Sequence, residues 1–287
     1  MFFFSPAKVN LFFRVLRKRE DGYHEIASLY QAIGLGDTLS IELSHKDELF
    51  CNNPSLPTDS TNLILKAVQL FRQKTALPIH AKIDLQKKIP MEAGLGGGSS
   101  NAATTLFALN SLTGSSASLQ DLATWSSELG SDISFFFSQG TAYCTGRGEK
   151  FELLPEITFP EKMWIAKPSY GLSTPVVYKA CVPSSFPQRD PKQALSECLQ
   201  GRLQYFNDLE IPAFQLKPEL ATLKQELLGL GFSSVTMTGS GTAFFCFGDL
   251  SLKPQLSGIQ FYETMPFSRK NEGWYGQSSE EIPFSRH

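Results

Sequence analysis

The part of the chain best suited to chemistry is a glycine-rich stretch at residues 90–103, with the sequence PMEAGLGGGSSNAA. Glycines let the backbone approach a bulky ligand, and the start of a following helix offers unpaired N–H groups and partial positive charge, which suits a polyphosphate. Ser99 and Ser100 add hydroxyls that can bond a phosphate or touch a phosphate-bound Mg²⁺. The structural alternative is a loop whose glycines only allow tight packing of a helix on a strand. Four glycines in five positions before a helix favour anion binding.

Two common nucleotide-binding motifs do not describe this stretch. The chain contains no Gly-Lys pair, which excludes the GxxxxGK[ST] loop, and Ser99 stands where a GxGxxG motif needs its third glycine. The His-Arg-Asp and Asp-Phe-Gly motifs of protein kinases are absent as well. The loop therefore belongs to another class of phosphate-binding site.

Three polar side chains outside the loop are further candidates for catalytic or binding roles: Lys8, Asn10 and Asp132. Lys8 and Asn10 share one face of a predicted strand, opposite Val9 and Leu11. By residue type alone, Lys8 fits a solvated strand lysine and Asp132 fits the N-cap of a short helix. Their chemical interpretation depends on the rest of the chain.

Three segments together resemble the GHMP small-molecule kinases, named for galactokinase, homoserine kinase, mevalonate kinase and phosphomevalonate kinase. The central match is Pro-x-x-x-Gly-Leu-Gly in the glycine-rich stretch, flanked by SPAKVNL at residues 5–11 and TGSGTA at residues 238–243. They follow the family order and span most of the chain. The resemblance implies an α+β fold of two domains, an N-terminal ribosomal-protein-like α/β domain and a C-terminal α/β sandwich domain, with ATP as co-substrate and Mg²⁺.

Within this superfamily, further segments resemble the branch that acts on a cytidyl diphosphate alcohol. They are REDGYHE at residues 19–25, TGRGE at 145–149 and STPVVY at 173–178. The resemblance implies ATP-dependent phosphorylation of the 2-hydroxyl of a cytidyl-diphosphate-linked methylerythritol, giving the 2-phosphate and ADP in non-mevalonate isoprenoid biosynthesis. Alternatives are another GHMP kinase acting on a small polyol or amino alcohol, and a catalytically dead ligand-binding relative.

The resemblance also assigns roles to residues. The family places its base after a Leu-Gly pair, which LGSD at residues 129–132 matches, so Asp132 would deprotonate the attacking hydroxyl. Lys8 would hold Asp132 ionised and stabilise the incipient alkoxide, because an opposite charge nearby favours a carboxylate. The resemblance implies that ATP is bound by Pro90, Met91, Glu92, Ala93, Gly94, Leu95, Gly96, Gly97, Gly98, Ser99 and Ser100.

The cytidyl substrate would meet a second set of residues. The resemblance places Tyr23 and Tyr178 on the faces of the cytosine and His24 at its edge. Plainer explanations are a hairpin tip for Tyr23 and His24, a helix N-cap for Thr174, and a strand-to-strand turn at residues 239–241. Glu92 is disfavoured as a metal ligand, and no protein metal site is expected. The expected substrate-binding residues are Asn10, Tyr23, His24, Thr174, Tyr178, Gly239, Ser240 and Gly241.

Alternation of apolar and polar residues predicts strands, and i, i+3, i+4 spacing predicts helices. An early hairpin should turn at Asp21-Gly22. Residues 45–61 should form a loop that ends in an N-cap run at 59–61. The last ~20 residues should form a tail or surface element. We expect strands at 37–43, 79–86 and 163–166, a hairpin at 141–154 and a strand-turn-strand at 235–247. We expect helices that start at 63 and 174, and helices at 102–114, 119–129, 131–138 and 219–228.

Composition limits the remaining possibilities. At 287 residues the chain allows one or two domains, and we place a boundary near Pro155, between residues 1–155 and 156–287. A net charge of −2 gives no whole-molecule attraction to nucleic acid or an anionic membrane. Five cysteines without a CxxC pair indicate reduced thiols. Because Lys8 is so close to Met1 that no transit peptide fits, we expect a cytoplasmic bacterial enzyme. We further expect a monomer or weak homodimer, with neither nucleic acid nor membrane as partner.

Overall fold

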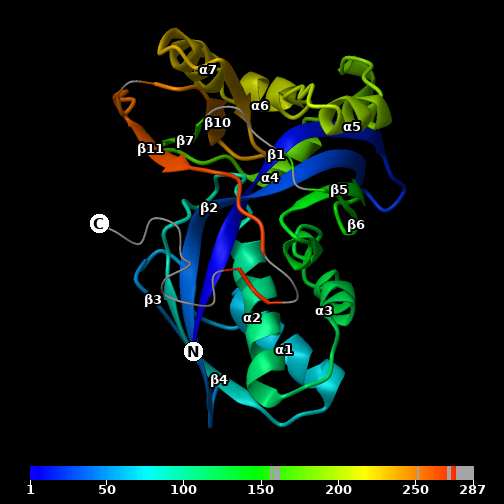
Figure 1. Ribbon diagram of the computed structural model, residues 1–287, viewed down its shortest axis with the longest axis vertical. Helices are drawn as coiled ribbons and strands as arrows, with labels where there is room; N and C mark the ends of the chain where they lie inside the picture. Colours follow the sequence, from blue (N-terminus) through cyan, green and yellow to red (C-terminus); the bar gives the residue numbers. More distant parts are fainter. Residues whose placement is uncertain (156, 158–161, 251, 270–272, 276–287) are drawn as a thin grey trace.

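A long β-hairpin opens the chain and forms the centre of the larger of two sheets. β1 (Phe2–Lys18) pairs antiparallel with β2 (His24–Ser44), and the predicted Asp-Gly turn lies between them. The strand predicted at residues 37–43 is the second half of β2. The computed structural model describes residues 1–155, 157, 162–250, 252–269 and 273–275 (Figure 1).

The larger sheet has the order β3-β4-β2-β1-β8, and β5 pairs with β2 and β6. One face of its outer part is solvated, so buried and exposed residues alternate along β4 as predicted. The prediction of a plain loop at residues 45–61 is wrong, because a four-residue strand pairs there parallel to β4. The added strands are β3 (Glu48–Cys51), β4 (His80–Gln86), β5 (Thr141–Gly146), β6 (Lys150–Leu153) and β8 (Phe206–Asn207).

Helices cover one face of this sheet and bury its apolar side chains (Figure 1). Gly114 caps the long central helix at its predicted end. The N-cap predicted at residues 59–61 is wrong by one position, since Asn62 accepts the capping bond from the N–H of Ile64. The helices are α1 (Leu63–Thr75), α2 (Gly97–Thr113), α3 (Leu119–Ser126) and the short 3₁₀ helix η1 (Ser134–Phe137).

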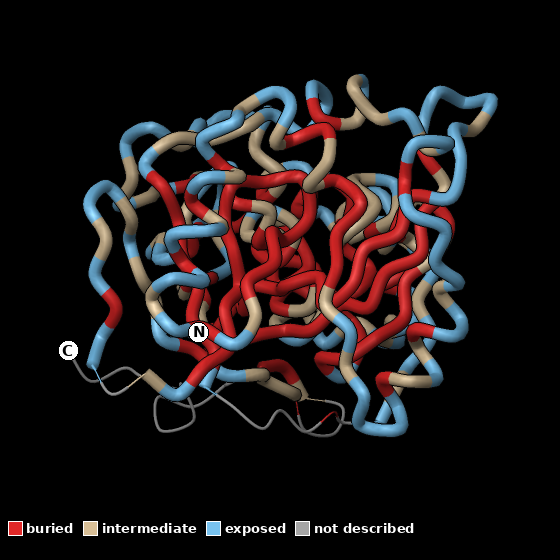
Figure 2. The backbone as a smooth tube through the Cα atoms, turned by 90° about the horizontal axis from the view of Figure 1, so that it is seen from above, coloured by how far each residue is buried: buried red, intermediate tan, exposed pale blue. Residues whose placement is uncertain are grey.

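The second sheet has the order β11-β7-β10-β9 and is antiparallel throughout. Its strands are β7 (Met163–Pro168), β9 (Ser234–Met237), β10 (Phe244–Phe247) and β11 (Ile259–Thr264). The helices packed with it are α4 (Thr174–Lys179), α5 (Pro191–Leu199), α6 (Glu210–Leu216) and α7 (Glu219–Gly229), with a 3₁₀ turn η2 (Pro183–Ser185). The buried backbone runs through the middle of the molecule, and exposed segments form its rim (Figure 2).

The predicted boundary near Pro155 remains a prediction. It falls beside residues 156 and 158–161, which lie outside the described residues. The two halves are connected at other places, because β8 extends the larger sheet beside β1 and Phe267 N donates to Ala32 O on β2 at 2.8 Å. The two halves therefore share backbone hydrogen bonds at places other than the predicted boundary.

The prediction of a polar surface tail is wrong for the part of the C-terminus that the structure describes. Trp274 is 4% exposed, its indole stacks on Phe107 of α2 at 4.7 Å, and its Nε1 donates to Phe4 O at 3.0 Å. The Arg269 guanidinium donates to the carbonyl oxygens of Phe137 and Ser138. These anchors have no helical or strand period, so hydrophobic patterning could not detect them.

Trp274→Ala should lower the free energy of unfolding by about 3–5 kcal/mol, the usual cost of emptying a large buried aromatic site. Urea unfolding followed by circular dichroism measures the change. Leu252→Ala, at a side chain that is 79% exposed, should leave the midpoint unchanged. An unchanged midpoint for Trp274→Ala would mean that the C-terminal segment does not contribute to the core.

Candidate active site

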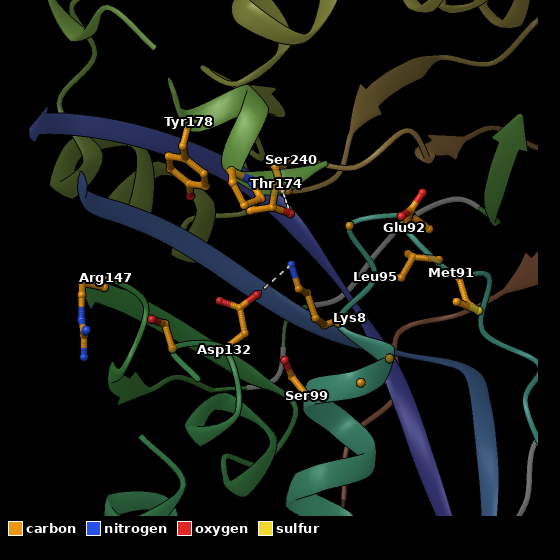
Figure 3. A pocket seen from close by; sticks show the side chains of 18 of the residues that line it. Lys8, Met91, Glu92, Leu95, Ser99, Asp132, Arg147, Thr174, Tyr178 and Ser240 are labelled. Carbon is orange, nitrogen blue, oxygen red and sulfur yellow. Dashed lines mark hydrogen bonds and ion pairs between the residues drawn. The ribbon is translucent and has the colours of Figure 1, made fainter. Parts of the chain in front are cut away.

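A cavity of about 890 Å³ lies between the glycine-rich loop, the tip of the β1–β2 hairpin and the start of α4 (Figure 3). Among the residues that the structure describes, two carboxylates line it, Glu92 and Asp132, against five Lys or Arg side chains: Lys8, Lys18, Lys87, Arg147 and Lys179. The site is therefore suited to an anionic ligand although the whole chain is slightly acidic.

The glycine-rich loop forms one wall of this cavity. All ten residues from Pro90 to Ser99 line it, whereas Ser100 is buried and accepts a hydrogen bond from the Ser5 hydroxyl at 2.8 Å. Ser100 N donates the first α2 hydrogen bond, to Gly96 O, so the N–H groups of residues 97–99 precede the helical ladder. The loop thus presents backbone donors to the cavity, as a phosphate site requires.

At two positions in this loop, glycine is required for different structural reasons. Gly96 caps α2 with φ of 69°, and a Cβ there would lie 3.0 Å from Cγ of Lys8. Gly94 has φ of 76°, and a Cβ there would lie 2.0 Å from the carbonyl oxygen of Thr238. The packing explanation therefore holds for Gly94, which lets the loop meet the 238–241 loop of the other half of the chain.

Asp132 lines the cavity two residues before η1, and its carboxylate faces Lys8 from β1 (Figure 3). The Lys8 Nζ lies 3.6 Å from Asp132 Oδ2, and the Tyr30 hydroxyl donates to Asp132 Oδ1 at 3.0 Å. Asp132 does not cap η1, whose N-cap position is Ile133. The pair brings together two residues that are 124 positions apart in the sequence (132 − 8).

Lys8 is almost entirely buried, with 2% of its surface exposed. Burial lowers its pKa below the ordinary lysine value, and the Asp132 carboxylate opposes that shift. Its Nζ also donates to Asn10 Oδ1 at 2.8 Å, and the Asn10 amide donates to the Ser28 hydroxyl at 3.0 Å. Asn10 lies behind Lys8 and outside the cavity lining, so in this structure it orients Lys8.

The opposite end of the cavity is aromatic. Tyr23 and His24 come from the β1–β2 hairpin and Tyr178 from α4, and the His24 and Tyr178 ring centroids are 5.3 Å apart at an angle of 32°. His24 Nε2 is buried and has no hydrogen-bond partner. Burial, with Lys18 adding to it, lowers the pKa of His24 below its ordinary value, which favours a neutral imidazole.

The 239–241 turn closes the cavity from the C-terminal half. Gly239 and Ser240 line it, and the Ser240 and Thr174 hydroxyls lie 2.7 Å apart. Gly241 is outside the lining and packs against Ala93. Thr174 is the first residue of α4, and the N-cap position is Ser173. The turn is held by Asn207, whose amide donates to the carbonyl oxygens of residues 237 and 239.

Several lining residues were not predicted from sequence. Tyr30 contacts Asp132, and Arg147 places its guanidinium 5.0 Å from the centre of the Tyr23 ring. Tyr30 lies in a stretch of β2 that is buried on both faces, so nothing in its type or spacing distinguished it from a core residue. Arg147 lies in the TGRGE segment at residues 145–149, but the family resemblance assigns it no role. Beyond the glycine-rich loop, the cavity is also lined by Leu56, Asn62, Leu85 and Lys87.

The part of the chain that the structure describes holds no group of three or more His, Cys, Asp or Glu side chains able to bind a metal ion. Among the same residues, no helix combines the length and the apolarity needed to cross a membrane.

Comparisons with known proteins agree with this geometry. Residues 62–140 match the GHMP kinases N terminal domain, and residues 190–257 match the GHMP kinases C terminal model. A 4-diphosphocytidyl-2-C-methyl-D-erythritol kinase of Protochlamydia amoebophila is 49% identical over 95% of this chain and 92% of its own length. The chloroplastic enzyme of that name from Mentha piperita is 42% identical over 98% of this chain and 74% of its own length.

Solved structures show the same relationship. The crystal structure of a 4-(cytidine 5'-diphospho)-2C-methyl-D-erythritol kinase superposes with a TM-score of 0.73 and 37% identity, over 87% of this chain and 90% of that one. A mevalonate kinase, 16% identical with a TM-score of 0.62, shares the fold. The predicted α+β GHMP kinase fold is confirmed, and the chain belongs to the 4-diphosphocytidyl-2-C-methyl-D-erythritol kinase family of GHMP kinases.

Proposed function

We propose that this kinase binds ATP along its glycine-rich loop and the cytidyl diphosphate alcohol between that loop and the aromatic end of the cavity, and that Asp132 activates the 2-hydroxyl. The observation that carries the proposal is the Lys8–Asp132 contact of 3.6 Å, which lies between the two binding regions. The product would be the 2-phosphate, with ADP released. This reaction belongs to non-mevalonate isoprenoid biosynthesis.

In the proposed step, the substrate 2-oxygen forms a bond to the γ-phosphorus of ATP. The bond from that phosphorus to the bridging oxygen of ADP breaks, and the hydroxyl proton moves to an Asp132 carboxylate oxygen. The Lys8 ammonium offsets the negative charge that gathers on the attacking oxygen. Both groups are held before substrate arrives, Lys8 by Asn10 and Asp132 by Tyr30, which limits the reorganisation that the reaction needs.

The two ends of the cavity offer different chemical groups, so each end suits a different ligand. The loop wall offers N–H groups at the start of α2, which suit the ATP phosphates. The adjoining apolar surface, with Leu56 and Leu85, suits the adenine base. The Tyr23, His24 and Tyr178 end offers ring faces and the unpartnered His24 Nε2, which suit a cytosine.

Mg²⁺ would be carried by the nucleotide. The lining near the loop offers the Ser99 hydroxyl and few carboxylates, a donor set that fits an ion held mainly by phosphate oxygens and water. Bound there, it would neutralise phosphate charge during transfer.

The alternative hypothesis is a kinase that phosphorylates a free polyol or amino alcohol, which would need no cytosine site. Release of ADP should be measured with the cytidyl diphosphate alcohol and with free methylerythritol as acceptors. We expect turnover only with the cytidyl substrate. Turnover restricted to the free alcohol would overturn the proposed substrate.

Tyr23→Ala should raise the KM for the cytidyl substrate roughly 10- to 100-fold, because one aromatic face is lost from the base. The KM for ATP should not change, since Tyr23 is at the far end of the cavity from the glycine-rich loop. Initial rates with each substrate varied in turn measure both constants. Phe50→Ala, at a comparably exposed ring on β3, is the control. An unchanged KM for the cytidyl substrate would remove Tyr23 from its site.

A further inference from the structure

Tyr30 contacts both members of the charged pair, and its hold on Asp132 has a specific consequence for the transfer step. Its hydroxyl donates to Asp132 Oδ1 at 3.0 Å, and the Lys8 Nζ lies 4.9 Å from the centre of its ring. Tyr30 is 1% exposed, and its ring packs on Phe135 of η1 at 5.2 Å. The side chain is thus fixed by packing while its hydroxyl reaches the cavity.

We propose that Tyr30 is a positioning residue for phosphoryl transfer: its hydroxyl holds Asp132 Oδ1, so that Oδ2 stays directed at Lys8 and is free to accept the substrate proton. A carboxylate one-third exposed at the end of a turn can otherwise rotate about its Cβ–Cγ bond. The inference rests on the proposed role of Asp132 and adds a residue that acts through it.

The hydroxyl is a constant donor over the working pH range. Burial raises the pKa of Tyr30 well above its ordinary value, and the adjacent Asp132 carboxylate adds to the shift. Tyr30 therefore keeps its proton and can donate the hydrogen bond to Asp132 Oδ1 throughout that range.

The other titratable groups around Asp132 come from three further elements. Cys144 on β5 and Tyr178 on α4 both have pKa values raised by burial, with Asp132 contributing, so they stay neutral. Lys8 on β1 supplies the positive charge. In the adjacent β5–β6 turn, Arg147 lies 4.0 Å from Glu149. Lys8 and Tyr30 thus approach the two oxygens of the Asp132 carboxylate, one at each.

Tyr30→Phe tests the proposal, because it removes the hydroxyl and keeps the ring beside Lys8 and Phe135. We expect the plateau value of kcat to fall roughly three- to tenfold as the carboxylate loses its orientation. The KM values for ATP and for the cytidyl substrate should not change, because the Tyr30 hydroxyl bonds the Asp132 carboxylate and the substitution leaves the two binding regions intact. A loss confined to kcat separates a positioning role from a disturbance of the cavity.

Tyr143→Phe is the matched control. Tyr143 is 8% exposed on the neighbouring strand β5, and its side chain packs against Phe12 in a different core cluster. Its kcat and both KM values should match those of the unsubstituted enzyme. A Tyr30→Phe enzyme with the kcat of that control would overturn the inference, as would a raised KM for the cytidyl substrate with kcat unchanged. If Asp132→Asn abolishes turnover in the same assay, such a result leaves the proposed function standing.

Discussion

Asp132→Asn should lower kcat by at least about 1,000-fold, within the range that a lost general base produces. An amide has no basic oxygen able to take the hydroxyl proton, although it keeps the size of the carboxylate and can still accept from Tyr30. ATP affinity should change by less than about threefold, because the phosphate donors belong to the loop and to the start of α2. Single-turnover rates and nucleotide titration measure these two quantities separately.

Asp84→Asn is the control for this substitution, since Asp84 is an exposed carboxylate on the solvated face of β4. Its kinetic constants should be those of the unsubstituted enzyme. Most of the activity surviving in Asp132→Asn would show that this carboxylate is structural and that the hydroxyl is activated in another way.

Lys8→Met should lower kcat by about 100- to 1,000-fold, the usual effect of removing one charge or donor that stabilises a transition state. Methionine keeps an unbranched chain in a site that is tight, since a Cβ at residue 96 would already lie 3.0 Å from Cγ of Lys8. The change also removes the positive charge that lies 3.6 Å from Asp132 Oδ2. Rates at saturating concentrations of both substrates measure the loss.

Lys82→Met, at an exposed lysine on β4, controls for the loss of one positive charge. The double variant with Asp132→Asn should be nearly as slow as Asp132→Asn alone, because the two groups act on one proton transfer. A Lys8→Met enzyme that retains kcat within about threefold would assign Lys8 to stability and not to the reaction.

The sequence allowed the glycine-rich loop and its flanking elements to be predicted because their signals are local. β4 alternates, Ala102, Leu106 and Leu109 of α2 follow helical spacing, and the cap at Gly114 follows from the residue type. The contact between Lys8 and Asp132 is not local. It became predictable through the motif resemblance, since residue type alone favoured a solvated lysine and a helix cap.

Other features had no sequence signal that could be recognised. Tyr30 meets Asp132 only because β2 lies beside the segment before η1, a juxtaposition set by tertiary packing. Ser100 was expected at the phosphates, but the helical turn points it to Ser5 on β1. The C-terminal anchor depends on single side chains, such as Trp274, fitting against α2. Such contacts depend on shape and distance, which neither period nor composition encodes.

The most direct test is a crystal structure of this enzyme with the cytidyl diphosphate alcohol and a non-hydrolysable ATP analogue. We predict the substrate 2-hydroxyl within hydrogen-bond distance of an Asp132 carboxylate oxygen, the γ-phosphate of the analogue over residues 96–99, and the cytosine between Tyr23 and Tyr178 with its edge at His24. A 2-hydroxyl remote from Asp132, or a cytosine bound at the glycine-rich loop, would contradict the account.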